Sequence, residues 1–505
     1  MEPYDALDAI DVFAAATSAF ECLKGTLATA DTAVLAHHEL EELIEAEGRE
    51  LLRLLFQAHL DRRERADHHD VGPVRGRDGR VRSHCEPGHS RLLACVFGTV
   101  TVTRTAWRGK GLTSVHPADA ALSLPAHLHS NGLRRLAVLE AVRGSFDLAK
   151  AAIDDRCGSV LGKRQAEQLV ARAAIDIDSF YRQQVPLPAS ASTTLVLQFD
   201  GKGIVMRPEG LRPATLKAHL TQQRAMRTRI APGEKPNRKR MATLGCVFDA
   251  DPALRRPHDI IAPPDGRTSL RPPRPGPVAR AKWLTGSVIH PPEHTIAAAF
   301  DQAEARDHAR TWLVLVDGAR HQLDLIESES ARRGIEVTVL LDIVHVSEYV
   351  WAAAHAFHAV GTPEAEAWVA GHLTTILHGQ AARAAAEITT ETDSRGLRGA
   401  KRDAADACVR YLTCHLTQLH YDTALARGWP IATGAIEGAC RHLIGDRLEI
   451  TGARWGLTGA EAILKLRALN DNDNGDFDAY LRHHLAREHQ RLYLSPDQNN
   501  YDLTA

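Results

Sequence analysis

Two short, mainly apolar runs each end in an Asp-Gly pair, and this repeated pattern restricts the folds open to the chain. Leu195–Phe199 runs into Asp200, and Trp312–Val316 runs into Asp317, each followed by a glycine. A short apolar run that stops at a turn dipeptide is typical of a buried strand. The sequence therefore predicts two buried strands, each with one carboxylate at its C-terminal end.

A third acidic residue, Glu437, lies in a stretch of small residues that runs into a helix rich in Arg, His and Leu. Three carboxylates that converge from separate elements can hold two divalent cations about 3.5–4 Å apart, which clamp the attacking and leaving oxygens of a phosphoryl transfer. The set formed by Asp200, Asp317 and Glu437 thus predicts an enzyme that transfers nucleic-acid strands.

The composition is that of a soluble protein with several domains. The chain has 505 residues, and a domain averages about 150. No apolar stretch approaches the ~18 residues of a membrane span, and the N-terminus has acid where a signal peptide needs base, so we expect a cytoplasmic location and no membrane partner. The eight cysteines form no C-x-x-C pair, which argues against a zinc ribbon or a disulfide framework.

The charge is distributed unevenly along the chain. A formal net charge of -2 would not attract DNA, but a local basic strip is sufficient to contact a phosphate backbone. The loop at 208–240 is such a strip, and we expect it to bind DNA. Its candidate contacts are Arg227, Arg229, Arg238, Lys239 and Arg240.

The region before the strands divides into two parts. Residues 1–80 are predicted to be helical, with apolar residues from Leu40 to Ala58 near a heptad stripe, so this region either pairs with a second copy or packs on its own domain. Residues 81–185 predict a β hairpin around Gly98 and then a helix-turn-helix whose second helix opens with DNA-contacting side chains; the alternative is two ordinary packed helices. These side chains are Lys163, Arg164 and Gln165.

The order of elements from 190 to 345 predicts an α/β ribonuclease H-like catalytic core: three strands, a helix, a strand, a helix and a strand. The first three strands are expected at Leu195–Phe199, Gly203–Met206 and Met241–Phe248, with Pro263–Pro277 an exposed excursion. Residues 346–430 predict an all-α insertion, 431–475 return to the core with Glu437, and 476–505 form a polar tail without an assigned structure.

Several motifs resemble those of bacterial insertion-sequence transposases of the ISKra type, which are similar in architecture to Mutator-like transposases. The matching segments are Phe199–Gly203, Met206–Pro208, Val316–Gly318, Asp342–His345, Gly434–His442, Thr451–Leu457 and Gly459–Ala468. The resemblance implies a ribonuclease H-like core with an α-helical insertion before the catalytic glutamate. It also implies cleavage at the ends of an insertion sequence and strand transfer into target DNA. The implied partners are double-stranded DNA and further copies of the chain, as a homo-oligomer on DNA.

The resemblance also implies roles for single residues. Asp200, Asp317 and Glu437 match the three metal-binding carboxylates, while Asp342 and His345 match a paired motif after the fifth strand. Asp342 is the rival of Asp317, but Asp317 follows the fourth strand, which neighbours the first in this fold. His345 either supports the site through a hydrogen bond or is structural. Glu449 rivals Glu437 as the third acid, although its charged surroundings favour an ion pair.

The expected chemistry follows from the ligands. Carboxylate oxygens without a Cys/His cage favour Mg²⁺, with Mn²⁺ as a substitute. Arg454 and Trp455 are expected to hold DNA near the scissile phosphate, with core packing as the alternative for Trp455. Two other functions stay open: a DNA-binding protein without catalysis, derived from such an element, and a ribonuclease H-like nuclease that cuts without joining.

Overall fold

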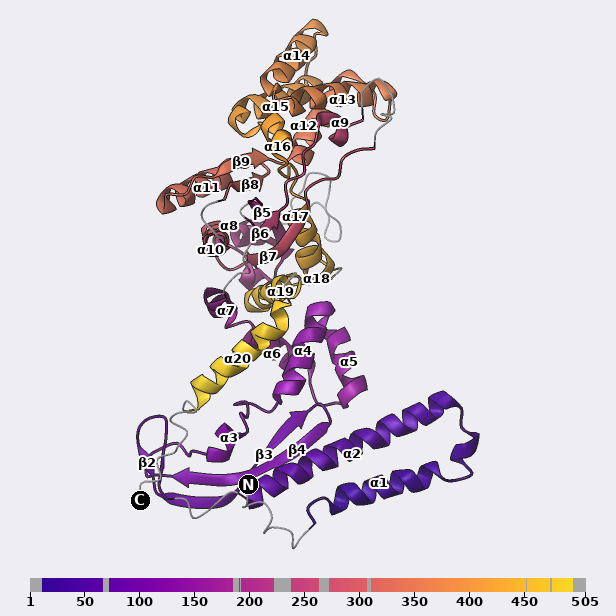
Figure 1. The fold of residues 1–505 in the computed structure, drawn as a ribbon, viewed down its shortest axis with the longest axis vertical. Coiled ribbons are helices and arrows are strands. Elements are labelled where there is room, and N and C mark those ends of the chain that lie inside the picture. Colours follow the sequence, from indigo (N-terminus) through magenta and orange to yellow (C-terminus); the bar gives the residue numbers. More distant parts are fainter. Residues whose placement is uncertain are drawn as a thin grey trace. The chain divides into compact units, whose positions relative to one another are not determined.

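The computed structural model describes residues 11–66, 72–184, 190, 192–221, 238–262, 272–306, 310–450, 452–472 and 475–493. The chain divides into two units (Figure 1). Unit 1 comprises Met1–Phe180 and Asp478–Ala505, and unit 2 comprises Tyr181–Phe477. Of the helices in the described ranges, none has both the length and the apolar character needed to cross a bilayer.

Unit 1 begins with two helices, α1 (Ala14–Leu27) and α2 (His37–Arg65), and α2 packs against a β hairpin. The hairpin consists of β3 (His84–Cys95) and β4 (Gly98–Arg108), and Cys95 pairs with Gly98 across a two-residue turn. The predicted hairpin is therefore confirmed. A second, short ribbon precedes it, made of β1 (Val74–Arg75) and β2 (Val81–Arg82).

The C-terminal half of α2 contributes to the core of the hairpin. Leu60 packs in one cluster with buried residues of both strands, Leu93, Cys95, Val100 and Val102. These contacts are the ones expected of an amphipathic helix folded onto its own domain. Ile44 in the N-terminal half is 46% exposed, and the pairing of this helix with a second copy stays a prediction.

Three helices follow a short one, α3 (Pro117–Ala121), and pack against one another. They are α4 (Asn131–Arg143), α5 (Phe146–Cys157) and α6 (Lys163–Ala173). Ser130 caps α4 and Ser145 caps α5, because each hydroxyl accepts a hydrogen bond from the backbone N–H three residues later. Gly158 ends α5 with a φ of 76°, which favours glycine. The predicted helix, glycine turn and second helix are all present.

The segment at 476–505 contains a helix where the sequence analysis expected only a polar tail. Helix α20 spans Asp476–Leu492, and Phe477, Tyr480 and Leu481 are buried. The Tyr480 hydroxyl donates to the carbonyl oxygen of Ala173. The spacing i, i+3, i+4 of these apolar residues is the signal of an amphipathic helix, which the many charged residues around it concealed.

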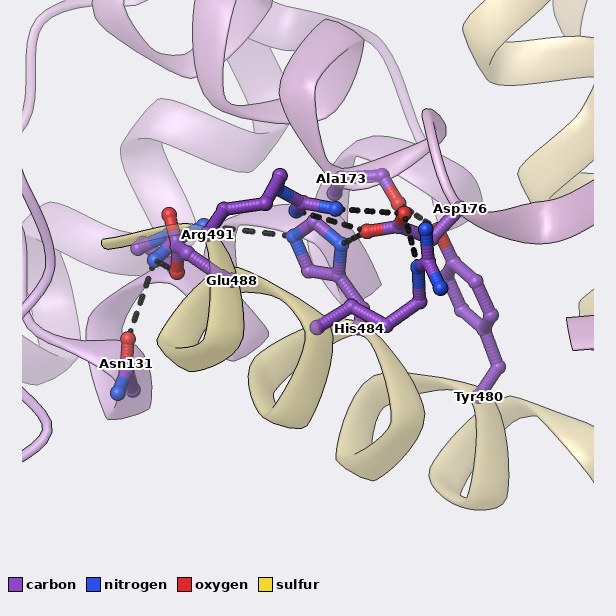
Figure 2. Close-up of polar contacts among 9 residues, drawn as sticks. Asn131, Ala173, Asp176, Tyr480, His484, Glu488 and Arg491 are labelled. Carbon is purple, nitrogen blue, oxygen red and sulfur yellow. Dashed lines mark hydrogen bonds and ion pairs between the residues drawn. The ribbon is translucent and has the colours of Figure 1, made fainter. Parts of the chain in front are cut away.

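One buried carboxylate, Asp176, binds three basic side chains of helix α20 (Figure 2). Asp176 is 3% exposed and accepts hydrogen bonds from His484 at 2.7 Å, Arg487 at 3.0 Å and Arg491 at 2.7 and 2.9 Å. Burial alone would raise the pKa of Asp176, but the bonds from Arg491, His484 and Arg487 outweigh it and lower the pKa to about 2. The stabilisation of unit 1 by ionised Asp176 is therefore complete above the ordinary pKa of an aspartate, and it is lost as the pH falls towards about 2.

We expect Asp176→Asn to destabilise unit 1 by about 3 kcal/mol, because it removes the negative charge and one of the two acceptor oxygens that three basic side chains share in a buried site. Amide hydrogen exchange in α20 measures this. The matched control is Asp478→Asn on the same helix, since Asp478 makes an exposed ion pair with Arg135, which contributes about 0–1 kcal/mol. Equal protection of α20 in both variants would contradict the role of Asp176.

Unit 2 is built on a mixed five-stranded sheet in the order β7-β6-β5-β8-β9. The strands are β5 (Thr194–Val205), β6 (Lys239–Ala250), β7 (Ala279–Ser287), β8 (Trp312–Val316) and β9 (Thr338–Leu341). β5, β6 and β7 pair antiparallel, whereas β5, β8 and β9 pair parallel. Helices α10 (Pro292–Arg306) and α11 (Arg320–Arg333) precede and follow β8. Two short helices that were not predicted, α8 (Pro213–Thr221) and α9 (Pro257–Ile260), lie between the antiparallel strands. The predicted order of strand, helix, strand, helix and strand is confirmed from β7 onward.

Two of the strand assignments were wrong. Gly203–Met206 is not a separate strand, because β5 continues through Gly201 and Gly203 and pairs with β6 along its whole length. The third strand is β7, which was not expected because it is an edge strand with basic residues and no apolar run. Residues 272–277 of the expected excursion carry no helix or strand, and 263–271 lie outside the described residues.

Helices follow β9 without interruption, and residues 342–430 contain no strand. They are α12 (Ile343–Phe357), α13 (Pro363–Leu377), α14 (Ala381–Ser394), α15 (Ala400–Cys414) and α16 (Tyr421–Arg427). The chain then continues through α17 (Gly434–Ala439), a π-helical turn at Cys440–Gly445, α18 (Asp446–Leu448) and α19 (Leu457–Asn470). α19 packs on β7 and α17 packs on β5, so the chain returns to the sheet.

Candidate active site

The two predicted strand-borne carboxylates lie on neighbouring strands. β5 and β8 pair in parallel, and Gln198 opposite Leu315 is the last pair of this ladder. Asp200 and Asp317 each come two residues after it. The expectation that the strand of Asp317 neighbours the strand of Asp200 is confirmed. Gly318 follows with a φ of 91°, and a Cβ there would lie 3.2 Å from the Tyr411 hydroxyl, so the turn after β8 requires a glycine.

One face of α17 meets the acidic residues. Thr433 directly precedes α17, Glu437 lies within it and Cys440 directly follows it. Their spacing of i, i+4, i+7 places them on one side of the helix. The Thr433 hydroxyl lies 2.5 Å from Asp342 Oδ2 and 3.1 Å from Glu437 Oε1. The Cys440 thiol donates to Asp200 Oδ2 over 3.1 Å. Carboxylates from β5, from the end of β9 and from α17 are thus joined by this face.

Negative charge is crowded around Thr433. Its hydroxyl has only one proton, so it can donate to Asp342 or to Glu437 but not to both at once. The pKa of Glu437 is raised, first by burial, then by the hydrogen bond and the charge of Asp342, and more weakly by Asp200. Burial and the charge of Asp200 raise the pKa of the Cys440 thiol, which stays a neutral donor. A bound cation would relieve this crowding.

Asp317 and Asp342 occupy different surroundings. Asp342 is 2% exposed; its Oδ1 accepts from the Val344 N–H as the cap of α12, and its Oδ2 accepts from Thr433. Asp317 is partly exposed, and its Oδ1 accepts from the Ala319 N–H over 2.9 Å. Both oxygens of Asp342 are therefore engaged inside the protein, while Asp317 is more accessible to a ligand.

Gln198 joins the strand of Asp200 to the helix of Glu437, a role that the sequence analysis missed. This side chain is 1% exposed, donates to the Ala432 carbonyl over 3.3 Å and accepts from the Ile436 N–H over 3.0 Å. A single amide within the apolar run of β5 was the available signal, because a buried polar group requires partners.

The helices that follow β9 contact the strand ends. The Tyr411 hydroxyl donates to the Asp317 carbonyl over 2.8 Å, and the fully buried Tyr421 donates to the Leu341 carbonyl over 2.9 Å. Tyr349 stacks on Tyr411 with ring centroids 4.0 Å apart, and the His345 ring meets both rings edge-on. His345 Nδ1 lies 3.2 Å from a Glu348 oxygen. These contacts are those of the structural alternative for His345.

The helix-turn-helix candidates are partly occupied by local contacts. Lys163 pairs with Asp147 of the preceding helix over 2.6 Å. The Gln165 side chain accepts from the Gly162 N–H over 2.8 Å and so caps α6. Arg164 is exposed. All three side chains lie in the first turn of α6.

The basic-loop candidates differ from one another. Arg227 and Arg229 lie outside the described residues, and Arg238 is partly exposed. Lys239 pairs with Glu449, which confirms the ion pair expected for that glutamate. Arg240 donates to the carbonyls of Val288, Gly210 and Ile289. Burial lowers its pKa. These bonds join the backbone at Gly210 to the backbone at Val288 and Ile289.

Trp455 is buried, whereas its neighbour Arg454 is exposed. Trp455 is 8% exposed, its indole N–H donates to the Leu448 carbonyl over 3.0 Å, and the Arg447 guanidinium lies over its ring. These are the contacts of the core-packing alternative. Arg454 is exposed.

The donors at this site are carboxylate oxygens, which suit Mg²⁺ or Mn²⁺. Across the described ranges, however, no three His, Cys, Asp or Glu side chains are gathered in a metal-binding group. No protein-family profile and no curated protein sequence matches the chain.

We expect Gln198→Met to lower the free energy of unfolding of unit 2 by about 2 kcal/mol, since it keeps the volume but removes two hydrogen bonds of about 1 kcal/mol each. Equilibrium denaturation measures the change. The exposed Gln380 at the start of α14 supplies the control, because Gln380→Met should stay within about 0.5 kcal/mol of the wild type. Equal stability of the two variants would refute the role of Gln198 in joining β5 to α17.

Proposed function

We propose that the chain is a metal-dependent DNA transposase of the DDE type, which cuts at the ends of an insertion sequence and transfers the cut strand into target DNA. The observation that carries the proposal is the meeting of Asp200, on the central strand, with the helix that bears Glu437, although 237 residues separate them in the sequence. Asp317 on the neighbouring parallel strand supplies the third carboxylate.

The arrangement of the sheet supports a ribonuclease H-like core as the scaffold of this proposal. Three antiparallel strands are followed by two parallel ones, and the first strand is central. The second carboxylate comes from the strand next to the first, as this fold requires. The helical segment between β9 and α17 agrees with the insertion that the transposase resemblance implies.

In the proposed site, Asp200, Asp317 and Glu437 would hold Mg²⁺, with Mn²⁺ as a substitute. Two such cations, when bound, activate the attacking oxygen and stabilise the leaving 3′-oxygen. The protein's own groups orient the ligands: Cys440 donates to one oxygen of Asp200, and Thr433 lies against Glu437. Gln198 fixes the strand of Asp200 relative to α17. No Ser or Tyr nucleophile is needed, because the cut DNA strand itself attacks the target.

The DNA contacts of the proposal come from two places. In unit 1 the first turn of α6, with the exposed Arg164, is suited to enter a major groove. In unit 2 the basic loop and the exposed Arg454 supply cations for phosphates. Double-stranded DNA and a homo-oligomer assembled on it are the partners that transfer of two element ends would require.

We expect Asp200→Asn, Asp317→Asn and Glu437→Gln each to abolish cleavage while leaving the melting temperature close to that of the wild type, because each removes a ligand charge without changing volume. The assay combines Mg²⁺, a target plasmid and a labelled duplex that carries the ends of the DNA segment encoding the chain. Asp324→Asn, which breaks an exposed pair with Arg320, should keep full activity.

Asp342→Asn is the informative comparison. Asp342→Asn keeps an oxygen that can cap α12 and removes one of the crowded charges, so it should leave the melting temperature close to that of the wild type and reduce activity only in part. Strand transfer that survives Asp317→Asn and disappears with Asp342→Asn would show that Asp342 is the second ligand. Cleavage without joined products in the wild type would favour a nuclease over a transposase.

A further inference from the structure

Two lysines beside the candidate active site share a single carboxylate. Lys202 on β5 and Lys239 on β6 lie 3.5 and 2.5 Å from the two oxygens of Glu449, directly after α18. The side chains of the lysines are 35% and 48% exposed, and that of Glu449 is 20% exposed. The cluster therefore has an excess of one positive charge and is open to solvent.

The cluster is close to the predicted metal ligands. Lys202 is two residues after Asp200 on the same strand, so both side chains leave the same face, about 7 Å apart along the strand. A Cβ on Gly445 would lie 3.5 Å from Lys202 Nζ, and Gly445 belongs to the π-helical turn that begins with Cys440, the thiol donor to Asp200. The ammonium group of Lys202 therefore lies beside the predicted metal ligand Asp200.

The backbone is shaped to admit the second lysine. A Cβ on Gly203 would lie 3.0 Å from Lys239 Cδ and 3.2 Å from Lys239 Cβ, which is closer than side chains normally pack. A residue larger than glycine at 203 would displace the stem of Lys239, which carries the ammonium group to Glu449.

We propose that Lys202 and Lys239 bind a backbone phosphate of the DNA substrate, and that Glu449 occupies this site until DNA displaces it. The inference rests on the proposed function, because it supplies the substrate. A carboxylate and a phosphate both present anionic oxygens to ammonium donors, so each can fill the same place. Glu449 acts as an internal competitor that weakens binding of DNA adjacent to the metal ligands.

The test measures binding of a random-sequence duplex to the full chain by fluorescence anisotropy, without divalent cations and at several salt concentrations. Glu449→Gln should tighten binding by roughly fivefold, the factor for one unfavourable charge contact removed near 4 Å in water, and steepen the salt slope by about one. Asp251→Asn is the matched control, because Asp251 pairs with the exposed Arg280 in the same unit and its loss changes the net charge equally.

The lysines are tested in the same assay. Lys202→Gln and Lys239→Gln should each cancel the gain in the Glu449→Gln background, and Lys202→Gln alone should weaken binding more than Lys401→Gln, which removes an exposed lysine of α15. This single variant keeps the test decisive if Glu449→Gln fails to fold. Equal binding by Glu449→Gln and Asp251→Asn would overturn the proposal. So would equal binding by Lys202→Gln and Lys401→Gln.

Binding without metal separates this inference from the proposed function. A wild type that never cleaves DNA, but whose binding responds to Glu449→Gln and Lys202→Gln as stated, refutes the transposase and keeps the phosphate site. A wild type that cleaves and transfers DNA, with binding indifferent to these changes, keeps the transposase and refutes the phosphate site.

Discussion

The crowding of negative charge where β5, the end of β9 and α17 meet is the constraint on which the arrangement of unit 2 depends. Asp200, Asp342 and Glu437 come together from segments far apart in the sequence, and such charges repel one another unless they are bonded or neutralised. The groups placed between them are uncharged donors, the Thr433 hydroxyl and the Cys440 thiol. They hold the carboxylates in place without cancelling their charge, which keeps the site attractive to cations.

The helical insertion is connected to the same constraint through the backbone. Two tyrosines from α15 and α16, Tyr411 and Tyr421, donate to the carbonyls of Asp317 and Leu341. These carbonyls lie where β8 and β9 end, so the helical segment that follows β9 is bonded to both strand ends. The stacking of Tyr349 on Tyr411 and the edge contact of His345 fix the Tyr411 ring in turn. The helices that follow β9 are therefore part of the structural support of the candidate site.

The sequence predicted those features that depend on local pattern. The apolar runs before Asp200 and Asp317 and the alternation around Gly98 are local signals, and the strands and the hairpin follow from them. The roles of Gln198 and Cys440 depend on contacts across 234 to 240 residues, which no spacing announces. β7 was missed because an edge strand needs no continuous apolar run, and β5 was divided wrongly because glycine inside a strand resembles a turn.

Unit 1 is built from two segments at opposite ends of the sequence. Its candidate helix-turn-helix is in the first part of the sequence. Asp176, which follows it, is paired by His484, Arg487 and Arg491, and these residues come after the whole of unit 2. A buried carboxylate that lacks these partners is unfavourable, and Tyr480 fills part of the same interior. Unit 1 therefore cannot be completed until unit 2 has been synthesised, and the candidate DNA-reading helices reach their final packing only in a chain that already contains all the candidate catalytic carboxylates.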